Sequence, residues 1–170
     1  DTQVARGGSG HDNITQSGGF GADTQVADGG RGADRIEQNG GSGNDTQIAR
    51  GGAGNDRIDV NGGSGHDRLI VNGQQGNDVI NINGGRGDDR ITYDVSAGRD
   101  RVNIDGGSNW LLRENDHATI NMGDHNARIV DHQGRVLYDG GSGGSTITVS
   151  NVEHLTVLGA DGKPVQLNRY

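Results

Sequence analysis

The chain has 170 residues, of which 28% are apolar, 3% are aromatic and 34 are glycine, and its formal net charge is −8. Low hydrophobicity combined with high net charge is close to the composition of disordered chains, so an ordinary apolar core is not expected to hold this chain together by itself. An acidic chain without cysteine and without an apolar run of ~20 residues is not expected to bind nucleic acid, to form disulfides or thiolate metal sites, or to span a membrane.

An eleven-residue repeat organises residues 1–105. Its motif, Gly-Gly-x-Gly-x-Asp, is complete at residues 7–12, 18–23, 29–34, 40–45, 51–56, 62–67 and 84–89. Glycine at the first, second and fourth places allows the positive φ of a tight turn, and the five residues after each Asp alternate polar and apolar like a short strand. A turn and a short strand at a fixed period predict a β-solenoid. There is no N-terminal signal peptide, and Asp1 already stands at the Asp place, so we expect a fragment of a longer protein.

A second period of 22 residues sets the predicted register, because residues 1–5, 23–27 and 45–49 all spell Asp-Thr-Gln-(Val/Ile)-Ala. Two repeats then make one coil, and residues 22 apart stack at ~4.8 Å. The alternating residues predicted to point inward are Ile14/Gln16, Ile36/Gln38, Ile58/Val60, Ile80/Ile82 and Val102/Ile104 in one sheet, and Gln3/Ala5, Gln25/Ala27, Gln47/Ala49, Leu69/Val71 and Ile91/Tyr93 in the other. Buried glutamines need hydrogen bonds, which ladders between coils would supply. In the alternative register, the three Asp-Thr-Gln-(Val/Ile)-Ala segments are shifted by one residue, so that Val4, Val26 and Ile48 point inward. We favour the register without this shift, called the unslipped register below.

Residues 106–170 are expected to form a C-terminal capping region after the solenoid of residues 1–105. The segment from Asn109 to Leu112, with the single Trp, is predicted to cover the end of the solenoid. Strand–turn–strand elements are expected over residues 118–139, a degenerate repeat over 140–150 with Ser145 at the Asp place, and a closing hairpin over 155–167.

The chemistry of the repeat points to a cation. Each glycine turn exposes backbone carbonyls and brings one carboxylate, and stacked coils place two such turns together, which gives the hard oxygen ligands that Ca²⁺ prefers. The predicted carboxylate ligands are Asp1, Asp12, Asp23, Asp34, Asp45, Asp56, Asp67, Asp78, Asp89 and Asp100. The predicted carbonyl ligands are Gly8, Gly10, Gly19, Gly21, Gly30, Gly32, Gly41, Gly43, Gly52, Gly54, Gly63, Gly65, Gly76, Gly85, Gly87 and Gly98. Four stacked Asp pairs on each of two edges make about eight Ca²⁺ sites, which would change the net charge from −8 to about +8.

These motifs resemble the RTX family of calcium-binding repeats, written G-G-x-G-x-D-x-U-x. The resemblance covers residues 1–105, although the period here is 11 rather than the nine of the family. It implies an all-β, right-handed parallel β-roll of about five 22-residue coils, with Ca²⁺ between successive turns. It also implies a secreted, extracellular protein, often exported by a type I system, that folds on meeting calcium. The chain has no catalytic motif, so it is not expected to be an enzyme; a protease, lipase, epimerase, toxin or adhesin activity would lie in an upstream domain.

The outward face of the first coils suggests a function of another class. In the unslipped register a flat Thr-x-aliphatic array faces outward, made of Thr2, Val4, Thr24, Val26, Thr46 and Ile48. Such an array is like the faces of ice-binding β-solenoids, and an exposed apolar row also suits a partner surface. Arg68 and Arg90 interrupt it in the following coils. Ice or surface binding is therefore the alternative prediction.

Overall fold

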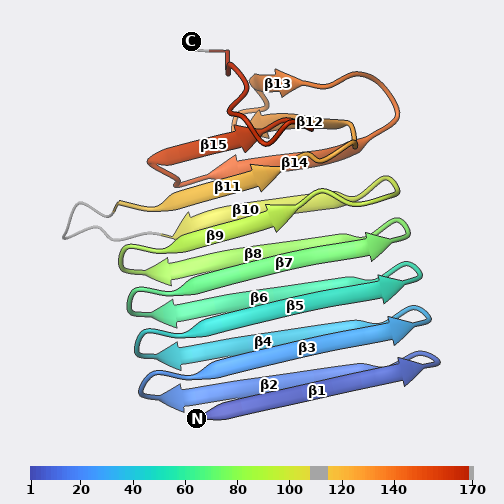
Figure 1. Cartoon of the computed structure of the whole chain (residues 1–170). Helices are drawn as coiled ribbons and strands as arrows, with labels where there is room; N and C mark the ends of the chain where they lie inside the picture. Colours follow the sequence, from blue (N-terminus) through green and yellow to red (C-terminus); the bar gives the residue numbers. More distant parts are fainter. Residues whose placement is uncertain (108–114, 169–170) are drawn as a thin grey trace.

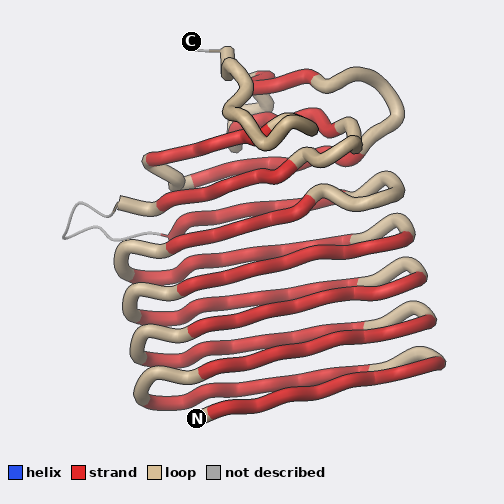
Figure 2. Tube along the Cα trace, in the orientation of Figure 1, coloured by secondary structure: helices blue, strands red, loops and turns tan. Residues whose placement is uncertain are grey.

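The computed structural model describes residues 1–107 and 115–168, and every regular element in these ranges is a β-strand (Figures 1 and 2). The chain passes back and forth between two sheets that face each other. Sheet A contains, in spatial order, β1 (Thr2–Ser9), β3 (Thr24–Arg31), β5 (Thr46–Ala53), β7 (Arg68–Gln75), β9 (Arg90–Asp94), β11 (His117–Asn121) and β15 (His154–Leu158). Sheet B contains β13 (Val136–Asp139), β12 (Ala127–Asp131), β14 (Ser145–Ser150), β10 (Arg101–Gly107), β8 (Val79–Arg86), β6 (Arg57–Ser64), β4 (Arg35–Ser42) and β2 (Asn13–Phe20).

The fold is a parallel β-solenoid, which confirms the predicted fold class. From β1 to β8 each residue pairs with the residue 22 positions later, as in Thr2 with Thr24 and Arg57 with Val79. Neighbouring strands within each sheet run parallel, apart from the antiparallel pair β12 and β13. The stack continues past the repeat region, because β11 and β15 extend sheet A and β14 extends sheet B. In the part of the chain that the structure describes, no helix is long and apolar enough to cross a membrane.

The turns are shorter than the motif predicts. Strand β1 includes Gly7, Gly8 and Ser9, and its pairing continues through Gly8 with Gly30, so only Gly10 and the two residues after it make the bend. The φ angles of Gly8 and Gly10 are +100° and +121°, as predicted for the second and fourth places. The prediction for the first place was wrong, since Gly7 has no positive φ. Glycine is needed there for space, because a Cβ on Gly7 would stand 2.6 Å from Asp12 Oδ2.

The core has the unslipped register. Gln25 and Gln47 are fully buried, whereas Val4 is 56% exposed. The predicted glutamine ladders form: Gln47 Nε2 donates to Gln25 Oε1 at 2.8 Å, and Gln38 Nε2 donates to Gln16 Oε1 at 2.7 Å. Later coils replace the glutamines with apolar side chains, which are aliphatic except for Tyr93, from Val60, Leu69 and Val71 onward. Each aliphatic side chain of this kind contributes about 2 kcal/mol by burial.

The C-terminal strands partly follow the predicted elements. Strand β14 stacks on β10 with Thr146 opposite Arg101, so Ser145 occupies the place of the ladder Asp. Strands β12 and β13 form an antiparallel pair around a turn at Gly134. The closing hairpin is reduced to a single bridge between Leu158 and Pro164, and residues 165–167 form no strand. The predicted cap at residues 109–112 lies outside the described residues.

Candidate metal centre: two buried aspartate ladders

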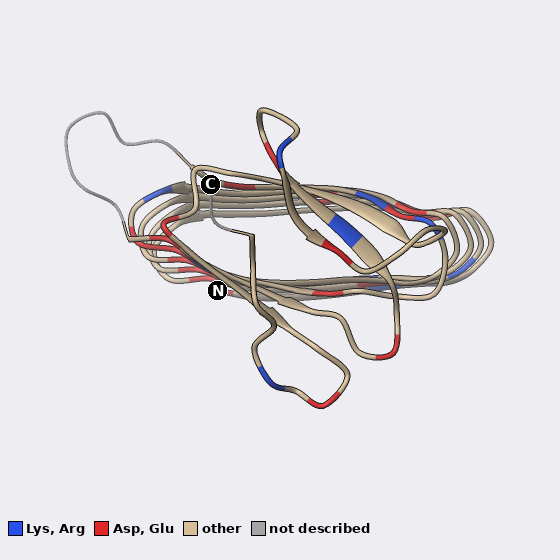
Figure 3. Cartoon of the chain, turned by 90° about the horizontal axis from the view of Figure 1, so that it is seen from above, with Lys and Arg blue, Asp and Glu red and all other residues tan. Residues whose placement is uncertain are grey.

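The predicted carboxylate ligands form two columns, one at each edge where the chain crosses between the sheets. Figure 3, which looks down the stack, shows acidic residues recurring in register along one edge. Asp12 is half-buried and Asp1 is exposed. The other eight are at most 4% exposed: Asp23, Asp34, Asp45, Asp56, Asp67, Asp78, Asp89 and Asp100. Carboxylates are seldom buried to this degree unless they are hydrogen-bonded or paired with a cation.

From the second coil onward, one oxygen of each ladder carboxylate ties neighbouring coils together. Asp67 Oδ1 accepts the backbone N–H of Asp45 at 2.8 Å, and Asp45 Oδ1 accepts that of Asp23 at 2.7 Å. The same bond joins Asp34 to Asp56 and Asp56 to Asp78 on the opposite edge, at 2.8 Å each. A turn leaves this N–H without a strand partner, and the side chain from the next coil supplies the acceptor. This explains why the period of the Asp residues is strict.

The second oxygen, Oδ2, differs from Oδ1 in seven of these residues. It is buried without a hydrogen-bond partner in Asp12, Asp23, Asp34, Asp45, Asp56, Asp67 and Asp78. The Oδ2 atom lies against the first glycine of its own repeat. For example, a Cβ on Gly62 would stand 2.5 Å from Asp67 Oδ2, and it would be closer still to the carbonyl oxygen of Gly84 in the next coil. At Gly7, Gly18, Gly29, Gly40, Gly51 and Gly62, a carboxylate oxygen and a backbone carbonyl oxygen thus both lie next to the first glycine of the repeat; at Gly73 the nearest atoms all belong to Asp78.

The carbonyls of the second and fourth glycines lie elsewhere. They face the equivalent glycine of the next coil, so that a Cβ on Gly63 would overlap the oxygen of Gly41 and a Cβ on Gly65 that of Gly43. The carbonyl that accompanies Oδ2 belongs to the first glycine, which sequence reasoning did not select. No sequence signal separates the three glycines, because the difference lies in the direction of each peptide plane.

The electrostatics of the ladders are unfavourable for bare carboxylates. Burial raises the pKa of Asp67 and of Asp78 from 3.8 to about 6; the backbone hydrogen bond opposes this, and the neighbouring Asp carboxylates reinforce it. Burial raises the pKa of Asp56 as well. At the ~4.8 Å spacing of paired strands, two unit charges repel by about 3 kcal/mol at an effective dielectric constant of about 20. Each row therefore favours a bound proton or a counter-cation.

The two ladders end differently. On one edge Asp100 closes the row, because the hydroxyl groups of Tyr93 and Ser96 each donate to its Oδ2 at 3.1 Å and that of Ser145 donates at 3.2 Å. On the other edge the row continues, since Asp116 Oδ1 accepts the N–H of Asp89 at 2.7 Å.

The sequence reasoning missed Asp116 because the spacing from Asp89 is 27 residues rather than 22. The signal that could have found it is local. Asp116 follows an Asn and precedes an alternating strand, β11, in the same way as Asp78 precedes β8.

A second ladder, also missed, runs along the outside of the turns. The side chain at the fifth place of the motif accepts the N–H of the equivalent residue in the next coil, as Asn55 Oδ1 does from Asn77 at 2.8 Å and His11 Nδ1 from Ala33 at 2.8 Å. His66 Nδ1 likewise accepts the N–H of Asp88 at 3.0 Å. The recurrence of Asn and His at this place is therefore explained by an acceptor in the side chain, and it gives these histidines a structural role.

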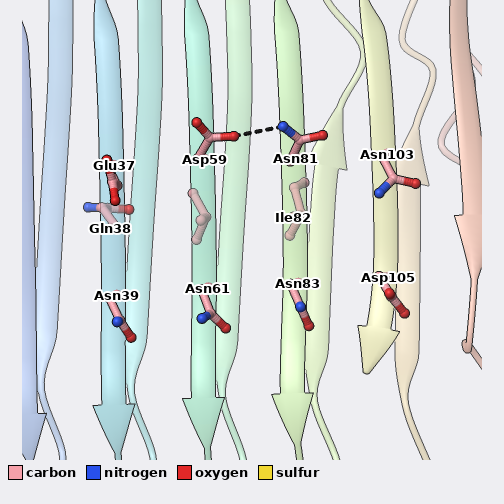
Figure 4. A pocket seen from close by; sticks show the side chains of 11 residues that line it. Glu37, Gln38, Asn39, Asp59, Asn61, Asn81, Ile82, Asn83, Asn103 and Asp105 are labelled. Carbon is pink, nitrogen blue, oxygen red and sulfur yellow. Dashed lines mark hydrogen bonds between the residues drawn. The ribbon is translucent and has the colours of Figure 1, made fainter. Parts of the chain in front are cut away.

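The outward faces of the two sheets differ in character. On sheet A the predicted Thr-x-aliphatic array is in register, with Val4, Val26, Ile48 and Ile70 in one column. On sheet B a polar groove of about 340 Å³ runs between two columns of side chains. Figure 4 shows these columns, which are Glu37, Asp59, Asn81 and Asn103, and Asn39, Asn61, Asn83 and Asp105.

Together the fold and the edges define a parallel β-solenoid with a buried carboxylate ladder on each edge. Among residues 1–107 and 115–168, no group of three or more His, Cys, Asp or Glu side chains is arranged to hold a metal ion. A cation in the ladders would therefore take carboxylate oxygens from at most two Asp residues, and backbone carbonyls for the rest. A scan against models of protein families found no match, and neither did searches of curated proteins and of solved structures.

Proposed function

We propose that the chain is a calcium-binding solenoid whose two aspartate ladders hold Ca²⁺ between successive coils. The observation that carries the proposal is the row of buried Oδ2 atoms without hydrogen-bond partners, from Asp12 to Asp78. A buried carboxylate oxygen beside a carbonyl oxygen suits a hard cation, and Ca²⁺ tolerates irregular sets of six to eight oxygen ligands better than Mg²⁺ does. The Asp pairs 22 residues apart number eight, four on each edge. Asp89 with Asp116 adds a further pair on one edge, whereas Asp100 on the other edge already accepts three hydroxyl groups at Oδ2, so the expected total stays at about eight sites.

The bound charge would couple calcium to folding. Without cations, the folded state holds many carboxylates buried and close together, whereas the unfolded chain leaves them in water. Binding to the folded state alone stabilises it in proportion to the logarithm of the free cation concentration. The proposed role is that of a module of a secreted protein, which remains unfolded at low intracellular calcium and folds in the extracellular space, where sites of this type bind at ~10⁻⁴–10⁻³ M.

Circular dichroism of the calcium-free chain tests this role, and pH provides a second arm. The folded-state pKa of Asp67 and Asp78, about 6, lies above the unfolded value of 3.8, so their protonation favours the folded state fully below pH 3.8, and this contribution is lost as the pH rises through 6. After dialysis against chelator we expect the strand signal to be weak at pH 7.5 and stronger at pH 5. At pH 7.5 millimolar Ca²⁺ should restore it, and Mg²⁺, the matched control, should do so far less. An unchanged strand signal in chelator at pH 7.5 would show that the ladders need no cation.

A further inference from the structure

A column of basic side chains crosses the outward face of sheet A. Arg68, Arg90, His117 and His154 pair in register on β7, β9, β11 and β15, and all four are exposed. The rings of His117 and His154 stack with their centroids 4.5 Å apart. Directly opposed like charges on neighbouring strands destabilise a sheet unless something offsets them. Arg68 and Arg90 therefore place two positive charges side by side on a chain whose formal net charge is −8.

Among the described residues, the two arginines of this column have no carboxylate partner. No Asp or Glu among the described residues lies within 4.0 Å of the charged nitrogens of Arg68 or Arg90. By contrast, Arg35, Arg57 and Arg135 each form an ion pair with a carboxylate. The nearest exposed carboxylate in sequence, Asp88, accepts the N–H of Asn115 at 3.1 Å. Asp94, further along β9, accepts a hydrogen bond from Asn121. The neighbouring carboxylates are thus engaged with other groups.

Sheet B provides an internal comparison at the same place in the repeat. There Arg35 contacts Glu37 at 3.3 Å, and Arg57 contacts Asp59 at 3.0 Å. Both carboxylates belong to the outward column shown in Figure 4. On sheet A the corresponding column carries Thr92 beside Arg90 instead of an acid. Among the described residues, sheet B thus presents two arginines paired with carboxylates, and a third at the same place, Arg101, lies beside Asn103 without an ion pair. On sheet A, both Arg68 and Arg90 are without an ion pair among the described residues.

The unpaired arginines also line a groove. Its volume is about 260 Å³, and its lining residues are Arg68, Arg90, Ile91, Thr92, His117 and Thr119. Each guanidinium presents a planar fork of N–H donors that matches the oxygens of sulfate, phosphate or carboxylate. The threonine hydroxyls and the imidazole add further hydrogen-bonding groups in the same groove.

We propose that this groove binds an oxyanion group of the sulfate or phosphate type, with Arg68 and Arg90 as its principal ligands. The site lies on the outward face of sheet A, and Arg68, Arg90 and His117 directly follow the buried ladder residues Asp67, Asp89 and Asp116. The oxyanion would contact the outward side chains and not the cation proposed for the ladder. The oxyanion belongs either to a free ion or to a sulfated or phosphorylated polymer, and the column of basic groups on successive strands suits repeated anions along the stack.

Calorimetric titration with sulfate tests the site in the folded chain, with Ca²⁺ present and the strand signal verified. Sulfate is the probe because calcium phosphate is poorly soluble. We expect saturable binding that weakens about tenfold or more in Arg90→Gln and in Arg68→Gln, which is the loss expected for one charge-assisted hydrogen bond. Arg57→Gln, which removes the same charge from the other face, should change the affinity less than twofold. Absence of saturable binding, or equal losses in all three variants, would overturn the proposal.

A second titration with a sulfated polysaccharide identifies the source of the oxyanion. Tighter binding of the polymer than of sulfate, lost in Arg90→Gln, supports a polyanionic partner. Equal affinity per sulfate group, with the same dependence on Arg90, supports a free ion. Polymer binding that is insensitive to Arg90 but falls with salt would reflect general charge attraction and would overturn the site.

Discussion

Replacing Asp67 by Asn is expected to shift stability in opposite directions with and without calcium. Asn keeps the oxygen that accepts the N–H of Asp45, but it removes the buried charge. In chelator at pH 7.5 the variant should retain more strand signal than the parent chain. Its free energy of unfolding should be higher by up to about 3 kcal/mol, because the pKa of Asp67 is raised from 3.8 to about 6 and each pKa unit corresponds to ~1.4 kcal/mol. In saturating Ca²⁺ it should unfold at a lower urea concentration, because Asp67 would contribute to two sites, with Asp45 and with Asp89.

The matched control is Asp124→Asn, which removes an exposed charge from a turn outside both ladders. It should leave urea midpoints nearly unchanged in both conditions, as surface substitutions usually do. If Asp67→Asn stabilised the chain equally with and without calcium, Asp67 would be a structural carboxylate without a bound cation. If it destabilised the chain equally in both, the ladder hydrogen bond rather than the charge would dominate.

Gly32→Ala is expected to prevent normal stacking of the first two coils. A Cβ at this place would overlap the carbonyl oxygen of Gly10 in the preceding coil. Because this oxygen belongs to the backbone, it cannot move aside as a flexible side chain could. The φ of Gly32, +131°, adds strain for any other residue. We expect the free energy of unfolding, measured with urea in the presence of calcium, to fall by more than about 4 kcal/mol, as it does for severe defects of the core or backbone.

Gly10→Ala isolates the steric part of this effect. Gly10 stands at the same place in the motif with a similar φ, +121°, but a Cβ there would meet no atom within 4 Å. Its expected cost is therefore only the backbone strain, about 1–2 kcal/mol. Equal losses in Gly10→Ala and Gly32→Ala would mean that close stacking does not explain the fourth-place glycine.

The sequence was sufficient for the period, the register and the side chains that point inward, because these depend on local alternation repeated many times. The inward glutamines are the clearest case. Placing Gln25 and Gln47 inside contradicts their polarity, yet the repeat of Asp-Thr-Gln-(Val/Ile)-Ala against the alternation of later coils required it. The hydrogen bond between their amides offsets part of the cost of burial, while Gln47 Oε1, which faces Leu69 in the next coil, is left without a partner.

What the sequence did not predict depends on contacts between coils. Glycine has low strand propensity, so the extension of β1 through Gly7 and Gly8 came only with pairing to the next coil. The division of each carboxylate into a bonded Oδ1 and an unpartnered Oδ2 likewise depends on the turn 22 residues away. Asp116 escaped notice because an insertion breaks the period just before it.

Counting bound calcium is the most direct test of the account. Native mass spectrometry of the folded chain, with calorimetry to establish saturation, should find about eight Ca²⁺ ions. Asp67→Asn should lose about two of them, and Asp124→Asn none. A chain that folds fully in chelator at pH 7.5 and carries no specifically bound Ca²⁺ would contradict the assignment of the aspartate ladders as calcium sites.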